Sequence, residues 1–104
     1  MISDDEPLAS IRFEAQIIQW RGPAPYLFVF VPDEHVGEIR YAARLASYGW
    51  GVIPVEARIG PVGFTTSLFP KDGTYLLPIK VAVQEAAGVS VGDSVNVLMR
   101  ISSR

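Results

Sequence analysis

The chain has 104 residues, of which 49% are hydrophobic and 19% charged, with a formal net charge of −2 and no cysteine. These values are typical of one compact domain, and they argue against a disordered chain, a disulfide framework and thiolate metal sites. The slightly acidic balance also disfavours nucleic-acid binding, because proteins that neutralise phosphates usually carry a clear basic excess.

Residues 1–9 contain the acidic run Asp4, Asp5 and Glu6, and we expect them to form a disordered tail ahead of a single domain at 10–104. They lack the basic and then apolar order of a secretory signal. The longest apolar run, 26–31, is far shorter than the roughly 20 residues of a membrane helix. We therefore expect a soluble, cytoplasmic protein with no membrane partner.

Two strands are predicted in the first third of the chain. Residues 11–17 alternate between apolar and polar, and the alternation then slips, which predicts a bulge near Ile17 and Ile18. Residues 26–31 are apolar at every position. A strand of this kind is expected at the centre of a sheet with a helix covering one side.

The covering helix is predicted at 33–47, with Asp33 as the N-cap and Gly49 just after its end. Its apolar stripe consists of residues spaced three and four apart: Val36, Ile39, Ala43 and Ala46. Residues 53–59 then alternate as a strand, with Pro54 at an edge or near the start. Turns at 60–63 and 70–73 connect this strand to strands at 64–69 and 75–77, forming a meander.

A second helix is predicted at 78–87, with Pro78 in its first turn, Gly88 ending it and Val89 folding back on it. Gly92 and Asp93 form the next turn. The last strand places alternate side chains on one face: Val95, Val97, Met99 and Ile101. The order of elements predicts a mainly β fold, a barrel with two short helices.

One continuous core is expected from residues on the apolar side of each strand: Phe13, Phe28, Val55, Phe64, Ile79, Val95 and Val97. No catalytic constellation is visible. His35, the single histidine, has no carboxylates nearby at metal-ligand spacing, and Thr66 and Ser67 have no neighbouring base. We expect no catalytic residue, no metal and no cofactor.

One candidate ligand site remains, an anion pocket between the first helix and the meander. Arg40 and Arg44 share a helix face, and Lys80 follows directly after the strand at 75–77. The residues expected to converge there are Arg40, Arg44, Thr66, Ser67, Tyr75 and Lys80. A solvated helix face is the alternative for the two arginines. An aromatic pocket is a further alternative, lined by Trp20, Tyr26, Tyr41, Tyr48, Trp50 and Tyr75, although such residues are also common in a core or at its rim.

The order of several motifs resembles the bacterial and archaeal family catalogued as domain of unknown function 1905. The motifs are Phe13-Glu14-Ala15, Val31-Pro32 before a helix, the segment 64–70, Asp72-Gly73-Thr74-Tyr75, Leu77-Pro78-Ile79-Lys80, and Gly92-Asp93-Ser94-Val95 with Val97. The resemblance implies a single-chain, helix-capped double-split β-barrel related in fold to DNA-binding antitoxin barrels. It implies no established activity. The family commonly carries a basic pair where this sequence has Gln84 and Glu85.

Three functions remain open at this point. The first is a non-catalytic binding or interaction module for a protein or small molecule, which includes pairing with a second copy. The alternative is a nucleic-acid-binding regulator, and the third is an enzyme that uses Thr66, Ser67, Tyr75 or Lys80. The regulator is suggested only by the fold that the family resemblance implies.

We predict weak or no binding to duplex DNA at physiological salt, because the sequence pI is near 5.2 and Gln84 and Glu85 replace a basic pair. Gel-shift titration at several salt concentrations is the measurement. Submicromolar affinity with a steep salt dependence would favour the regulator instead.

Overall fold

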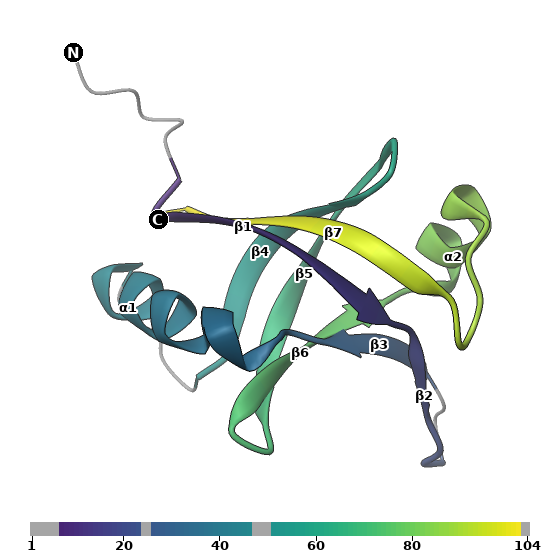
Figure 1. Ribbon diagram of the computed structural model, residues 1–104, viewed down its shortest axis with the longest axis horizontal. Helices are drawn as coiled ribbons and strands as arrows, with labels where there is room; N and C mark the ends of the chain where they lie inside the picture. Colours follow the sequence, from purple (N-terminus) through teal and green to yellow (C-terminus); the bar gives the residue numbers. More distant parts are fainter. Residues whose placement is uncertain (1–6, 24–25, 47–50, 103–104) are drawn as a thin grey trace.

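The computed structural model describes residues 7–23, 26–46 and 51–102 (Figure 1). The strands in these ranges are β1 (Ala9–Gln16), β2 (Ile18–Trp20), β3 (Tyr26–Phe30), β4 (Ile53–Ile59), β5 (Val62–Lys71), β6 (Thr74–Ile79) and β7 (Ser94–Ile101). The helical segments are a 3-10 turn, η1 (Asp33–His35), and two α-helices, α1 (Val36–Ala46) and α2 (Val81–Ala87).

The strands form one antiparallel sheet in the order β1-β7-β4-β5-β6-β3-β2. The two ends of this order, β1 and β2, are consecutive in the chain with one residue between them. The sheet therefore curls round on itself (Figure 1). The predicted fold class is confirmed: the protein is a mainly β, single-chain, helix-capped double-split β-barrel.

The connection between β1 and β2 is Ile17, where the sequence predicted a bulge. Its side chain is 1% exposed. Its N–H donates to the carbonyl of Asp93 and its carbonyl accepts from the N–H of Gly92, both at 2.9 Å. Beyond this residue the strand pairs with β3 instead of β7. The chain changes face at this residue, because Ile18 and Trp20 are exposed whereas Ile11 and Phe13 are buried.

The long strand β5 makes the second change of partner. It pairs with β4 as far as Leu68 and with β6 from Phe69 onward. The hairpin that follows turns at Asp72 and Gly73, whose φ values are 53° and 82°. Two consecutive residues with positive φ are typical of the tight type I′ hairpin turn, whose twist matches that of the strands. The predicted turn at 70–73 is thus confined to its last two residues.

The core lies inside the barrel and is built from the inward side chains of each strand. The predicted alternation of the last strand is confirmed, since Val95, Val97, Met99 and Ile101 are all buried. Among the residues predicted to share one core, Phe13, Val55, Ile79, Val95 and Val97 do so, and Phe64 packs against them while only partly buried. Phe28 is the exception. It is buried outside this cluster, because its position in β3 directs it away from the barrel interior.

The start of the second helix was predicted incorrectly. Pro78 lies in β6 opposite Phe28, and α2 begins at Val81 with Lys80 as its N-cap. The fixed φ of proline suits an extended strand as well as a first helical turn, so this residue does not distinguish them. The end is as predicted: Gly88 has φ 69°, and both its N–H and that of Val89 donate to the carbonyl of Gln84.

The first helix also begins differently from the prediction. α1 begins at Val36 and follows η1, which contains Asp33 and has Pro32 as its N-cap without a side-chain cap. The chain leaves β3 through a 3-10 turn, in which the His35 N–H donates to the Pro32 carbonyl at 3.0 Å. The buried stripe contains Ala42 instead of Ala43, which is half-buried. The predicted end at Ser47 and Gly49 lies outside the described residues, as do Tyr48 and Trp50.

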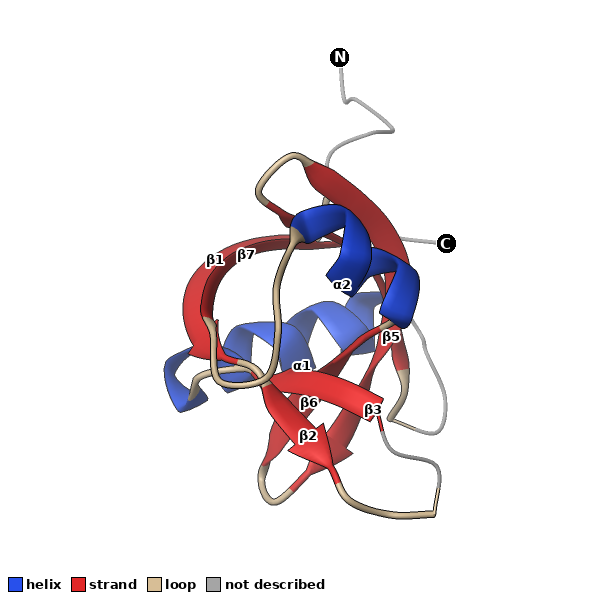
Figure 2. Ribbon diagram, turned by 90° about the vertical axis from the view of Figure 1, so that its right-hand side faces the viewer, coloured by secondary structure: helices blue, strands red, loops and turns tan. Residues whose placement is uncertain are grey.

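The helices cap the barrel at opposite ends (Figures 1 and 2). α1 contacts β1 and β7, and α2 contacts β5. The first helix was expected to cover β3, but its main strand contacts are with β1 and β7. β3 is flanked within the sheet by β2 and β6, as a central strand should be. Its outward side chains pack against those of these two strands.

We predict that Val97→Asp unfolds the domain. Val97 is 2% exposed and pairs with Phe13 and Ile59 in neighbouring strands, so an unpaired carboxylate would enter the core. This costs several kcal/mol against a total stability of roughly 5–15 kcal/mol. Circular dichroism and thermal melting are the measurements. An unchanged melting temperature would contradict the assigned strand phase.

Candidate functional site

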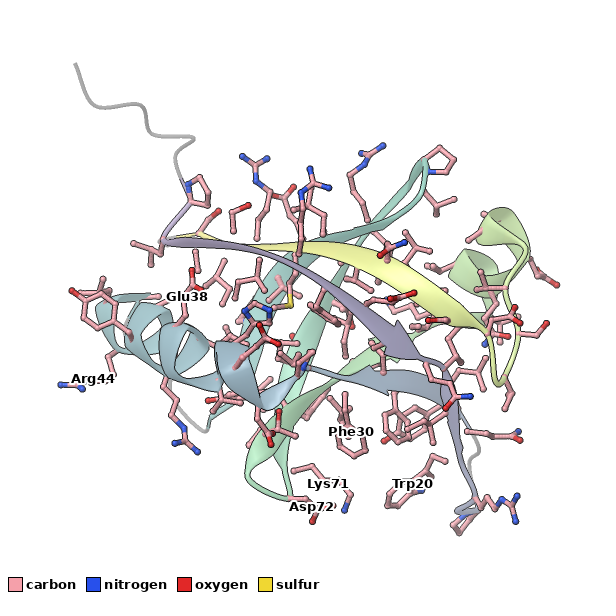
Figure 3. All side chains as sticks on the ribbon, viewed as in Figure 1. Trp20, Phe30, Glu38, Arg44, Lys71 and Asp72 are labelled. Atoms are coloured by element: carbon pink, nitrogen blue, oxygen red, sulfur yellow. The ribbon has the colours of Figure 1, made fainter. Side chains whose placement is uncertain are left out.

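The residues proposed from sequence for an anion pocket are only partly brought together. Thr66, Ser67 and Lys80 line one shallow depression of about 460 Å³ between β5 and the start of α2. Tyr75 is 7% exposed and belongs to the core. Arg40 and Arg44 lie exposed on α1, at the opposite end of the molecule from α2, where Figure 3 labels Arg44. Ligand binding by these residues stays a prediction.

An apolar surface lies on the outward side of β2, β3 and β6 and includes Phe69 of β5. Strand register places the members on one face, with Ile18 opposite Phe28, Trp20 opposite Tyr26, and Leu76 opposite both Phe30 and Phe69. We call this set the outer aromatic face: Ile18, Trp20, Tyr26, Phe28, Phe30, Phe69, Leu76 and Pro78. It is a second apolar layer, separated from the core by the sheet itself.

Ring contacts run continuously along this face. Trp20 and Tyr26 are stacked, with centroids 6.1 Å apart and planes 23° apart. Tyr26 and Phe28 lie at 5.9 Å, and Phe28 and Phe30 meet edge to face at 5.2 Å and 87°. These are the offset and T-shaped arrangements that aromatic quadrupoles prefer, each stabilising by about 0.5–1.5 kcal/mol beyond area burial. The rings thus hold one another in a defined arrangement.

The indole of Trp20 is held from two sides. The ammonium nitrogen of Lys71 lies 5.1 Å from the ring centroid, a cation–π contact that contributes about 0.5–1 kcal/mol at an exposed position. On another side, the indole lies directly against Gly22, where a Cβ atom would collide with it. Figure 3 shows Trp20, Phe30 and Lys71 projecting together on the side of β3 away from the barrel.

Burial divides the outer aromatic face into a covered centre and an exposed rim. Phe28 and Leu76 are 3% and 4% exposed, whereas Ile18, Trp20, Tyr26 and Phe69 are between 37% and 42% exposed. The centre is therefore buried within the monomer. The rim leaves apolar area open to solvent on a surface that its own aromatic contacts have already ordered.

A groove of about 610 Å³ adjoins this face at Tyr26. It runs between the β2–β3 hairpin and the start of α2. Two of its lining side chains, Val81 and Val91, are 65% and 50% exposed. The full lining is Gln19, Tyr26, Leu27, Ile79, Lys80, Val81, Gln84, Ser90 and Val91. The exposed apolar surface thus continues from the outer aromatic face into a groove.

A different, polar surface covers the outside of β1, β7 and β4. Leu98 lies opposite Arg12 on one side and Arg58 on the other, and Arg100 lies two residues further along β7. Two depressions of about 570 and 400 Å³ open there. Glu14 and Glu56 line them as well, so the three arginines share this surface with two carboxylates.

His35 is half-buried beside Phe13. Its ring centroid lies 6.3 Å from that of Phe13, and its Nε2 is 4.0 Å from a carboxylate oxygen of Glu34. In the described part of the chain, no three histidine, aspartate or glutamate side chains are grouped so that they could hold a metal ion. Neither α-helix in that part has the length and apolar character needed to span a bilayer.

Sequence reasoning missed the outer aromatic face, although its signal was visible. The doubly apolar segment 26–31 was correctly interpreted as a central strand, but its outward residues were assigned to a helix contact. Of the aromatics considered for a pocket, Trp20 and Tyr26 do meet, Tyr75 is in the core, and Tyr41 is exposed on α1.

Barrel, capping helices and outer face together define a small β-barrel domain with an ordered apolar surface. Residues 13–99 match the model of the family described as Domain of unknown function (DUF1905), so the chain belongs to that family. No match was found among curated proteins. The family description carries no activity.

We predict that Phe28→Ala destabilises the domain by about 3–5 kcal/mol, as in a core, because Phe28 is 3% exposed between Tyr26 and Phe30. Phe69→Ala, at a residue that is 42% exposed, is the matched control and should cost much less. Urea unfolding gives both values, with Phe28→Leu as a milder variant should the alanine variant not fold. Equal losses for Phe28→Ala and Phe69→Ala would mean that the outer cluster is not formed in the free protein.

Proposed function

We propose that this domain is a non-catalytic interaction module that binds a protein partner through the outer aromatic face. The supporting observation is the ring-packed apolar layer on the outside of β2, β3 and β6, whose rim residues are 37–42% exposed. Contiguous exposed apolar patches of this kind mark interaction sites in soluble proteins, and aromatic residues are enriched at the centres of interfaces. As part of the same proposal, the module acts in the cytoplasm.

The order already present on this face supports a protein partner. Trp20 is held between Tyr26, Lys71 and Gly22, so little side-chain freedom remains to be lost on binding. Immobilising a flexible side chain at an interface costs about 0.5–1.5 kcal/mol, and surfaces ordered in advance avoid that cost. Tryptophan and tyrosine are also the residues that most often dominate binding energy when a partner covers them.

Nucleic-acid binding is the second candidate, and the observation that favours it is the group formed by Arg12, Arg58 and Arg100. Glu14 and Glu56 lie on the same surface, which reduces its attraction for phosphates. We rank nucleic-acid binding below protein binding, because the carboxylates on the arginine surface oppose phosphate binding.

The partner can be tested by photo-crosslinking in cells that make the protein. A photoreactive phenylalanine analogue at Phe69 lies on the rim of the face, and the same analogue at Leu45, which is 54% exposed on α1, is the matched control. We expect a discrete crosslinked adduct from position 69 that position 45 does not give. Identical adducts from both positions, or none from position 69, would count against the proposed face.

A further inference from the structure

We infer that the partner presents an apolar segment bearing carboxylates, which lies across the outer aromatic face and into the groove beside Tyr26. This inference rests on the proposed function and names the chemistry of the partner. It follows from the charges at the border of the apolar surface, from the shape of that surface and from its area.

The charged side chains in contact with the rings of the face and in the lining of the groove are basic. Lys71 lies over Trp20 on the face, and Lys80 is the charged residue lining the groove. Arg21, exposed, directly follows Trp20 in the chain. The nearest carboxylate along the chain is that of Asp72, at the tip of the β5–β6 hairpin, where Figure 3 places it beside Lys71. Three basic residues thus border this apolar surface in a protein whose net charge is −2. Two carboxylates lie nearby, that of Asp72 and that of Asp93, which accepts a hydrogen bond from the N–H of the groove residue Ser90 at 2.8 Å.

These cations are available to a partner. Within residues 7–23, 26–46 and 51–102, the single ion pair at 4.0 Å or less joins His35 to Glu34, so Lys71 and Lys80 are not neutralised by a described carboxylate. Complementary charge at the border of an apolar interface fixes register and accelerates encounter. A carboxylate near Trp20 would also attract the Lys71 ammonium that already lies there.

A second copy of the chain fits less well. Large aromatic side chains bury about 150–250 Å² each, so four rim residues at roughly 40% exposure offer on the order of 250–400 Å². A stable interface needs about 800 Å² from each partner. Pairing of two copies through this face would also bring lysines of both copies to one interface, whereas an extended segment can cover the face and enter the groove.

The test uses two capped synthetic peptides of about ten residues, with the same leucines and phenylalanine and with either glutamates or lysines at the remaining charged positions. Titration into ¹⁵N-labelled protein, followed by amide chemical shifts, gives both site and affinity. We expect the glutamate peptide to shift amides of β2, β3, β6 and the first turn of α2, and to bind at least about tenfold tighter than the lysine peptide.

Matched charge variants locate the effect. Lys71→Gln combined with Lys80→Gln should lower the affinity for the glutamate peptide by about threefold to tenfold. Arg40→Gln combined with Arg44→Gln makes the same change in net charge on α1 and should leave the affinity unchanged. An equal loss in both double variants would show only a general charge effect and would overturn the inference.

The remaining outcomes separate this inference from the proposed function. Equal binding of both peptides at the face overturns the acidic preference and leaves the interaction module standing. Shifts confined to the surface of Arg12, Arg58 and Arg100 also overturn the inference, as does the absence of binding by either peptide. In both cases the crosslinking experiment at Phe69 still tests whether the domain is an interaction module. Concentration-dependent shifts of β2 and β3 without peptide would identify a second copy as the occupant.

Discussion

The bend at Ile17 is the constraint on which the rest of the molecule depends. A strand that continued straight would run past the start of β7 at Ser94 and leave the sheet open. Burial of the Ile17 side chain and its two backbone hydrogen bonds to residues 92 and 93 instead end the β1–β7 ladder and send the next three residues to β3. The same bend changes which side chains point outward, so Ile18 and Trp20 belong to the outer aromatic face. Barrel closure and the outer aromatic face thus have one origin.

Local patterns were sufficient to predict most of the fold. The alternation in 94–101, the left-handed Gly88 and the hairpin at Asp72 and Gly73 each follow from period or from φ requirements, which neighbouring residues determine. The errors fall where one residue satisfies two local structures equally. Pro78 suits a strand or a helix start, and Asp33 suits an N-cap or a 3-10 turn. In both cases the path of the chain through the barrel decides between them.

Candidate sites were predicted less well, because a site depends on which elements meet. Helical spacing correctly gives Arg40 and Arg44 a common exposed side, but it contains no information on where α1 packs. Because α1 packs near β1 and β7, both arginines lie at the opposite end of the barrel from the depression lined by Thr66, Ser67 and Lys80 (Figure 1). The aromatic layer shows the opposite case. Its members were visible in the sequence, and only strand register, with Trp20 opposite Tyr26 and Phe28 opposite Pro78, brings them together.

The central position of β3 has a consequence for how this protein opens. Leu27 and Val29 point into the core while Phe28 points into the outer layer. Leu27 and Phe28 are paired with β2 on one side and with β6 on the other. Fluctuations that expose this part of β3 to solvent must therefore disrupt two apolar layers and two ladders at once. Such a strand belongs to the most slowly exchanging part of a domain, with an opening free energy close to that of global unfolding. A surface built on it remains in place while loops and helix ends fluctuate.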